Sequence, residues 1–262
     1  MEKQSHLTLR RKVAKARRHN PKDDMNSALK LLSGLRQSRI IDLSQTLEEH
    51  MPHFPTHSKF FHNLWGSYWH GGRSLSYQLV MHEHNGTHVD APAHFVSDAK
   101  PQAHVTIELV PLGRLLGRGV HLDCRSMQPG QYVTKTRIAE WEAAHAPLAA
   151  GDIVLFDFGW AARWGLRPHD ESYTADWPGV AMDAAEYLIA KKVAALGVDT
   201  LSPDPPAALR SKPIHPVVLD SQVLIIENLC NLDQLPDFLL FLALPLKIRD
   251  GSGSPIRAVA IV

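Results

Sequence analysis

Residues 84–95 read His84-Asn-Gly-Thr-His88-Val-Asp90-Ala-Pro-Ala-His94-Phe95, and this stretch decides how the whole chain is interpreted. The Asn-Gly pair favours a turn, which brings the imidazoles of His84 and His88 toward each other. His88 and Asp90 are two residues apart and therefore lie on one side of an extended segment. The proline that follows fixes the backbone and directs His94 toward the same space.

This pattern of side chains is typical of a catalytic metal site. Two nitrogens and one oxygen from His84, His88 and Asp90 suit Zn²⁺ or Mn²⁺. Three protein ligands leave a position open for a water molecule, whose pKa the metal lowers toward about 7. The alternative is that these are ordinary histidines hydrogen-bonded to backbone, which a single histidine usually is. Three histidines and one aspartate around one turn favour the metal site.

The composition excludes several classes of protein. The chain has 262 residues, of which 44% are hydrophobic and 21% charged, so it is neither disordered nor collagen-like. The longest apolar stretch, Phe238–Leu246, is too short to span a membrane. The two cysteines of the chain form no CxxC pair, and we expect buried free thiols in a reducing, cytoplasmic compartment. Ten of the 16 histidines lie between His50 and His104, which again points to metal chemistry there.

Charge divides the chain into two parts. Residues 1–39 carry 11 Lys/Arg and 3 Asp/Glu, whereas residues 40–262 carry 17 and 24. We interpret residues 1–38 as a basic N-terminal extension and residues 39–262 as one domain. The extension has no apolar core of a secretory signal, and no aromatic residues alternate with its charges to stack on bases. We therefore expect no nucleic-acid partner and no membrane partner.

The hydrophobic pattern predicts more strands than helices. Strands are expected at 39–44, 75–81, 119–123, 152–158, 193–199, 222–227, 238–244 and 256–262. Helices are expected at 136–146 and 182–192, and residues 51–73 are expected to form a long loop rich in aromatic side chains. This mixture predicts a single α/β domain.

The string HNGTHVDAPAHF resembles the signature of the cyclase-like, metal-dependent amidohydrolase family, which includes bacterial kynurenine formamidase and isatin hydrolase. The blocks at 40–44, 51–52, 151–155, 197–204, 225–233, 244–248 and 254–260 resemble further parts of that family's sequence pattern. The resemblance implies a compact domain in which helices flank a mixed, partly closed sheet of the swivelling β/β/α type. It also implies a homodimer or homotetramer.

The resemblance assigns roles to individual residues. It implies that His84, His88 and Asp90 bind metal, that His94 is the general acid/base, and that His215 and Glu227 supply further ligands. From the residues alone, Glu227 is a weaker candidate: it ends an apolar strand, where a buried carboxylate needs a cation or a donor. The family's usual arginine after the late histidine is Pro216 here, and the sequence leaves open one or two ions, Mn²⁺ or Zn²⁺.

The loop before the metal motif suggests the kind of substrate. Its aromatic side chains suit a flat, partly apolar small molecule, and we expect a group of four, Phe60, Phe61, Trp65 and Trp69, to contact it. The alternative for each is packing in the core or at a dimer contact. In the resembled family this region contributes to the pocket, sometimes across a subunit interface.

We therefore expect a metal-dependent hydrolase that cleaves the amide C–N bond of an isatin-like cyclic amide or an N-formyl aryl amine. In this mechanism the metal activates water and His94 transfers the proton. Two alternatives remain, a lactone hydrolase or cyclase on the same scaffold and a non-catalytic metal- or ligand-binding protein. No G-x-S-x-G motif or phosphate-binding loop supports a different chemistry.

Overall fold

The structure, a computed structural model, describes residues 21–97 and 99–262. The chain divides into two compact parts between Arg39 and Ile40. Helix α2 (Pro21–Gln37) belongs to the first part, and its described side chains from Met25 to Gly34 are exposed. The strongly basic segment of the predicted extension, residues 1–20, lies outside the described residues.

The second part is built on a mixed sheet that closes into a ring. The ring contains seven strands in the order β12 (Gly253–Ile261), β11 (Phe238–Pro245), β5 (Leu116–Asp123), β7 (Ile153–Asp157), β9 (Ala195–Val198), β10 (Leu224–Glu227) and β4 (His88–Asp90). The three-residue strand β4 closes it, because β4 pairs with β10 on one side and with the start of β12 on the other. Strand β1 (Ile40–Asp42) pairs with the end of β12.

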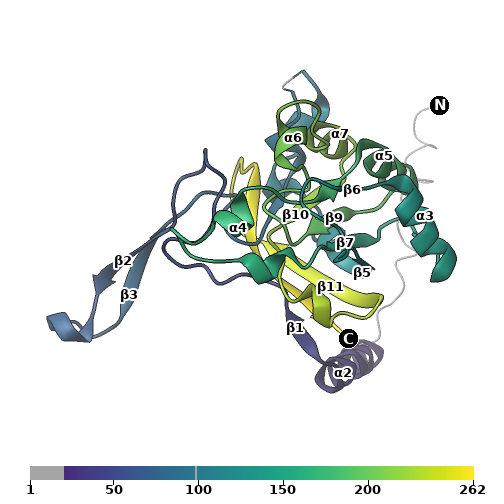
Figure 1. Cartoon of the computed structure of the whole chain (residues 1–262). Coiled ribbons are helices and arrows are strands. Elements are labelled where there is room, and N and C mark those ends of the chain that lie inside the picture. The colour runs from purple at the N-terminus through teal and green to yellow at the C-terminus, as the bar shows by residue number, and fades with distance from the viewer. Residues whose placement is uncertain (1–20, 98) are drawn as a thin grey trace, which may run out of the picture. The chain divides into compact units, whose positions relative to one another are not determined.

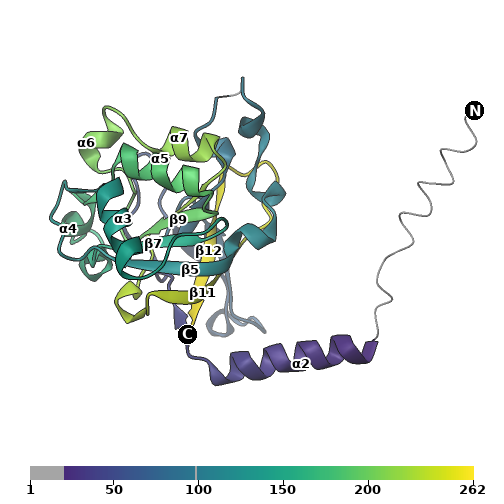
Figure 2. The same ribbon diagram turned by 90° about the vertical axis from the view of Figure 1, so that its right-hand side faces the viewer.

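Two hydrophobic cores lie on opposite faces of this sheet. Alternation along β7 shows the principle: Ile153 and Leu155 join one core, while Val154 and Phe156 join the other. The first core is made mainly by the strands of the ring. The second lies between the ring and three helices, α3 (Lys135–Ala144), α5 (Met182–Lys191) and α7 (His215–Asp220), which cover one side of the sheet (Figures 1 and 2).

Shorter elements complete this part. They are β6 (Tyr132–Val133), β8 (Gly179–Val180), α4 (Glu171–Thr174), α6 (Pro206–Leu209) and 3₁₀ turns η2 (Pro92–His94), η3 (Pro101–His104), η4 (Ile107–Leu109), η5 (Leu112–Leu115), η6 (Trp160–Arg163) and η7 (Leu232–Gln234). Helix α3 begins after Thr134, whose hydroxyl accepts a hydrogen bond from the Arg137 amide. None of the described helices is long and apolar enough to cross a membrane.

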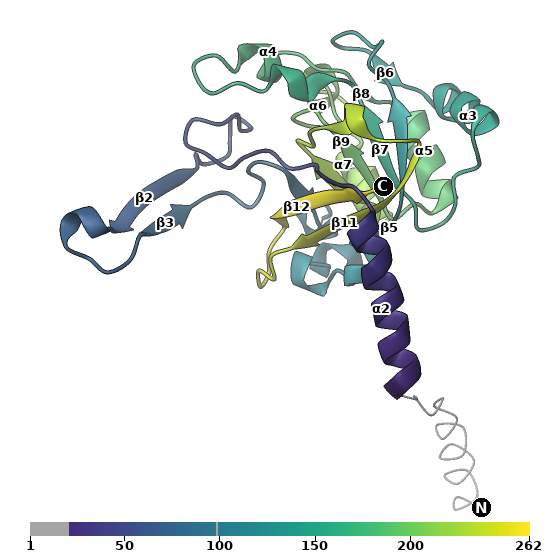
Figure 3. The ribbon, with the colours of Figure 1, turned by 90° about the horizontal axis from the view of Figure 1, so that it is seen from below.

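The prediction of a loop over residues 51–73 is wrong for residues 61–66. Residues 61–66 form strand β2 (Phe61–Gly66), which pairs with β3 (Ser76–Val80) in a hairpin that carries the 3₁₀ turn η1 (Tyr68–His70). The hairpin extends away from the ring, as Figure 3 shows. No alternation of apolar and polar residues marks β2 because almost all of its side chains are exposed.

The other expected elements are present, with ends that differ by a few residues. The strand predicted at 39–44 is shorter, and the strand at 119–123 begins earlier, at Leu116. Both cysteines are free, as expected, but only Cys124 is buried, whereas Cys230 is partly exposed.

Candidate active site

Strand register places three of the predicted ligands on one face of the sheet. Val89 packs into the core within the ring, so its neighbours His88 and Asp90 point to the opposite face. Antiparallel pairing sets Glu227 of β10 directly opposite His88. Side chains of directly opposed residues lie on the same face, and His88 Nε2 is 3.3 Å from Glu227 Oε2 and 3.4 Å from Asp90 Oδ1.

The predicted turn is present and orients two imidazoles. Gly86 has φ of +63°, a left-handed conformation that glycine adopts readily. Its carbonyl accepts a hydrogen bond from His88 Nδ1 at 2.9 Å, which leaves Nε2 of that ring to face the carboxylates. The turn also places His84 beside Asp90, with His84 Nδ1 2.6 Å from Asp90 Oδ1.

A serine far along the chain fixes the orientation of His84. Ser252 Oγ donates its hydrogen to Glu83 Oε2 at 2.8 Å, so it accepts from His84 Nε2, 2.9 Å away. The hydrogen of a neutral His84 ring is therefore on Nε2, and the lone pair of Nδ1 faces Asp90. His84 Nδ1 and Asp90 Oδ1, 2.6 Å apart, are then both hydrogen-bond acceptors, and they require a proton or a metal ion beside them.

The first residue of α7, His215, reaches the same place. Its Nδ1 is 2.5 Å from Asp204 Oδ2. Its Nε2 lies 3.1 Å from Glu227 Oε1 and 3.5 Å from Asp90 Oδ2. The two clusters predicted from distant parts of the sequence therefore meet, although Pro216 follows the histidine. Pro216 occupies the first turn of α7, where its missing N–H costs no helical hydrogen bond.

His94 lies beside these groups at the end of η2. Its ring stacks on that of His84, with centroids 3.9 Å apart and an angle of 22° between the planes. Burial, together with the nearby His84 and His215, lowers the pKa of His94 to about 4, against the opposing effect of Asp90. A neutral His94 imidazole is thus available near neutral pH to accept a proton.

The described residues contain two overlapping groups suited to a metal ion. His84, His88 and Asp90 form one, and Asp90, His215 and Glu227 form the other; within each group the ligand atoms lie within 4.8 Å of one another. All five residues are buried. Three imidazoles and two carboxylates that share Asp90 match the nitrogen and oxygen donors that divalent transition metals prefer.

The ionisation of these groups reflects their close contacts. Burial opposes the charged form of His88, but hydrogen bonds to Asp90 and Glu227 raise its pKa to about 10. Burial likewise opposes ionisation of Asp90, yet His84 and His215 hold the Asp90 pKa well below its usual range. Two buried carboxylates thus need positive charge close by, which protonated imidazoles or a divalent ion can supply.

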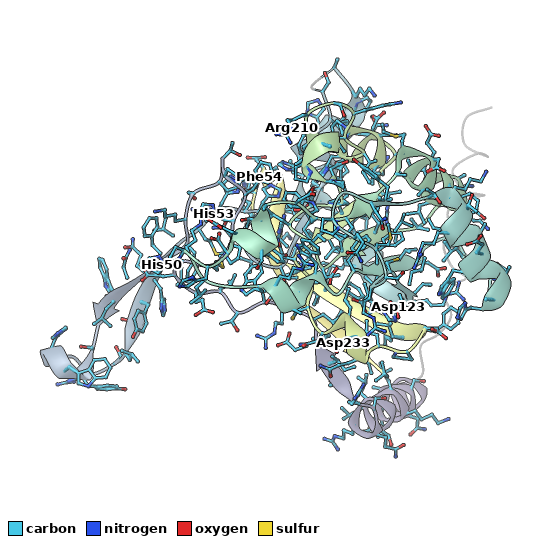
Figure 4. The ribbon with its side chains drawn as sticks, viewed as in Figure 1. His50, His53, Phe54, Asp123, Arg210 and Asp233 are labelled. Carbon is cyan, nitrogen blue, oxygen red and sulfur yellow. The ribbon has the colours of Figure 1, made fainter. Side chains whose placement is uncertain are left out.

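The five candidate ligands line a cavity. Its aromatic lining differs from the prediction. Phe54, His57, Phe95, Ser202 and Leu209 line it together with His94 and the five candidate ligands. Phe54 lies in the loop at the base of the hairpin (Figure 4).

The structure does not bring the four predicted aromatic residues to this cavity. Phe60 is buried elsewhere, and Phe61, Trp65 and Trp69 are exposed on the hairpin. Trp160 and Trp177 also lie away from the cavity lining and pack in the core between sheet and helices.

Sequence reasoning missed the residues that support the ligands. Asp204 and Ser252 each hold one nitrogen of a candidate ligand, and the only local sign of Asp204 is its place in a family block. Ser252 is 168 positions from its partner His84, and no local pattern links residues that far apart. His57 carries only one weak sign, its membership of the histidine-rich region.

Comparison with known proteins agrees with this arrangement. A family model described as putative cyclase matches residues 41–205. Isatin hydrolase of Roseibium aggregatum is 33% identical over 195 residues, which cover 70% of this chain and 73% of the relative. Kynurenine formamidase of Erythrobacter litoralis is 32% identical over 230 residues, which cover 85% and 94%.

A solved structure extends the comparison to the fold. The crystal structure of an isatin hydrolase bound to the product analogue thioisatinate superimposes with a TM-score of 0.83 at 27% identity. The match covers 93% of this chain and 99% of that one. The predicted α/β domain with a mixed, partly closed sheet flanked by helices is therefore confirmed, and the structure shows that seven strands close the sheet into a ring.

Proposed function

We propose that this chain, which belongs to the cyclase family, is a metal-dependent hydrolase that cleaves an amide C–N bond of a small aromatic or cyclic substrate. The observation that carries the proposal is the convergence of two ligand groups on Asp90, with the His94 ring stacked on His84. Its similarity to proteins named isatin hydrolase and kynurenine formamidase supports a cyclic amide or an N-formyl aryl amine as the substrate.

His84, His88, Asp90, His215 and Glu227 are the residues proposed to hold the metal, as one or two ions of Mn²⁺ or Zn²⁺. Their donors fit such an ion because the inward nitrogens of three histidines face two carboxylates, while outer hydrogen bonds occupy the other nitrogens. A divalent ion bound there supplies Lewis-acid polarisation of a carbonyl and lowers the pKa of a coordinated water.

His94 is the proposed general acid/base. In its neutral form the ring accepts a proton from water as the scissile carbonyl is attacked, and it then donates that proton to the departing nitrogen. Stacking on His84 holds the ring by its face, which leaves the nitrogens at its edge to exchange the proton. Phe54 and Phe95 give the cavity apolar walls that suit a flat substrate.

A substrate panel with controlled metal content tests the proposal. The chain is stripped with a chelator, reloaded with Mn²⁺ or Zn²⁺, and assayed with isatin, N-formylkynurenine and a dienelactone by a pH-indicator method. We expect hydrolysis of an amide that disappears on chelation and returns with metal. Turnover that survives chelation, or turnover of the lactone alone, contradicts the proposal.

Loss of Asp90 is the sharpest test of the ligand assignment. Asp90 belongs to both groups, so Asp90→Ala removes a donor from each and leaves the remaining imidazoles without their shared carboxylate. We expect the purified variant to lose most of its bound metal by elemental analysis, together with its activity. Asp183→Ala, at the start of α5, is the matched control and should keep the metal. Equal occupancy in both variants refutes the assignment.

A further inference from the structure

One side chain of the cavity, His57, has no place in the mechanism above. It lies in the loop before the hairpin, lines the cavity with Phe54 and Phe95, and belongs to neither candidate metal group. It is half-buried, which leaves part of its ring accessible. A polar group in this position can contact a substrate without displacing a ligand.

Three aromatic neighbours hold the ring of His57. It stacks on the His82 ring with centroids 4.0 Å apart and an interplanar angle of 7°. The ring of Phe54 lies 5.4 Å away and that of His84 lies 5.7 Å away, both tilted. The orientation of the imidazole is therefore set before any substrate enters, which lowers the entropy lost on binding.

The nitrogens of this ring have no hydrogen-bond partner among the described residues. Nδ1 is buried and has no hydrogen-bond partner among them. A hydrogen placed on Nδ1 would leave a buried donor unpaired, which is costly, so the neutral ring carries its hydrogen on Nε2. Nε2 is then the accessible nitrogen and a donor without a protein acceptor in the described part of the chain.

We propose that His57 is a substrate-contacting residue whose Nε2–H donates to a carbonyl oxygen that the substrate carries beside the scissile amide. The inference rests on the proposed function, and it adds a requirement to the substrate class. Isatin and N-formylkynurenine both have an aryl ketone near the amide, and a neutral donor on a fixed ring suits such an oxygen. His57 thereby favours keto-aryl amides over simple aryl amides.

Two substitutions separate this role from a purely structural one. His57→Phe keeps an aromatic ring to stack on His82 but removes the donor, whereas His57→Gln removes the ring but places an amide N–H near the position of Nε2. We expect kcat/KM for the better of the two amides to fall about tenfold in the Phe variant and about threefold or less in the Gln variant, with metal content unchanged. If stacking on His82 is the only role of His57, the Gln variant loses more kcat/KM than the Phe variant does.

A matched pair controls for the chemistry of substitution. His145 also stacks on an aromatic ring, that of Trp141 at 4.5 Å, but it does not line the cavity. His145→Phe and His145→Gln should both leave kcat/KM within twofold of the parent. Equal rates for the parent and His57→Phe overturn the inference.

A binding measurement keeps the test independent of turnover. If the parent hydrolyses neither amide, the proposed function fails, and isatinate is titrated calorimetrically into the manganese-loaded parent and both His57 variants. Binding that weakens about tenfold in the Phe variant and is retained in the Gln variant still supports a contact with the ketone. Equal affinity in all three proteins, or no binding to the parent, overturns it.

Discussion

At the scale of single residues, the three histidines proposed as ligands share one arrangement. Each has one nitrogen held from outside, by Ser252, by the Gly86 carbonyl or by Asp204, and the other nitrogen turned toward Asp90 or Glu227. Outer partners of this kind fix the tautomer and the direction of the lone pair. The centre is therefore organised by residues that are not themselves ligands.

His94 is expected to affect the rate rather than metal binding. His94→Ala removes the stacked imidazole but none of the five candidate ligands, so we expect kcat to fall at least about 100-fold while the metal content stays the same. Steady-state kinetics and elemental analysis on one preparation check both parts. Near-full turnover in the variant means that another group transfers the proton.

Asp199 is expected to make the stability depend on pH. Burial, reinforced by Asp157, raises the pKa of Asp199 from its usual 3.8 to about 7, although three backbone N–H groups oppose this shift. The folded protein then holds this proton more tightly than the unfolded chain does. Its contribution to stability is full below about pH 4 and is lost as pH rises through about 7.

Substitution of Asp199 by asparagine tests this dependence. Asp199→Asn cannot ionise, so between pH 5 and pH 8 the free energy of unfolding of the variant should rise relative to the parent by up to a few kcal/mol. Urea unfolding of both proteins at the two pH values, with the same metal content, gives the difference. A difference that is independent of pH contradicts the assigned pKa.

At the scale of elements, strand β12 and the turn of the metal motif are packed with no room between them. A Cβ added at Gly253 would lie 2.5 Å from His84 Cε1 and 2.8 Å from the Val89 carbonyl oxygen. Gly253 pairs with Asp90 in the register that closes the ring. Closure of the sheet and the position of His84 thus depend on the same glycine.

Gly253→Ala is expected to disturb the metal centre through the backbone. We expect stability to fall by roughly 1–3 kcal/mol, because the added methyl group cannot be accommodated without movement. Metal affinity should fall about tenfold or more, measured by competition with a chromophoric chelator. Gly113→Ala, which adds a methyl group into open space, is the matched control. Equal affinity in the two variants contradicts the coupling.

At the scale of the whole molecule, the hairpin β2–β3 carries an apolar surface that the other described residues of the part from Ile40 to Val262 leave uncovered. Trp65 and Trp69 are 77% and 74% exposed, and most side chains of both strands face solvent. An isolated two-stranded sheet is marginally stable in water. We propose that a second copy of the chain covers this hairpin, in keeping with the dimer or tetramer expected from the family resemblance.

Light scattering with size-exclusion chromatography measures the assembly. We expect the parent to run as a dimer or tetramer at micromolar concentration, and the double variant Trp65→Ser, Trp69→Ser to shift toward monomer. A control with Leu109→Ser and Leu112→Ser changes two other exposed apolar residues, which lie outside the hairpin, and should keep the parent mass. A monomeric parent contradicts the proposal.

The sequence by itself determined the parts of this protein that depend on neighbouring residues. The Asn-Gly turn, the shared side of His88 and Asp90, and most strands and helices follow from local conformational preference and from the alternation of apolar side chains. Family resemblance, and not local physics, linked His215 and Glu227 to them.

Only the tertiary structure decided what distant segments do to one another. Pairing of β4 with both β10 and β12 closes the ring, sets Glu227 opposite His88, and brings Ser252 to His84. The exposed hairpin and the position of His57 in the cavity were likewise decided only by the tertiary structure. These contacts join residues with no local relation in the sequence, and burial of apolar side chains on both faces of one closed sheet fixes the register that brings them together.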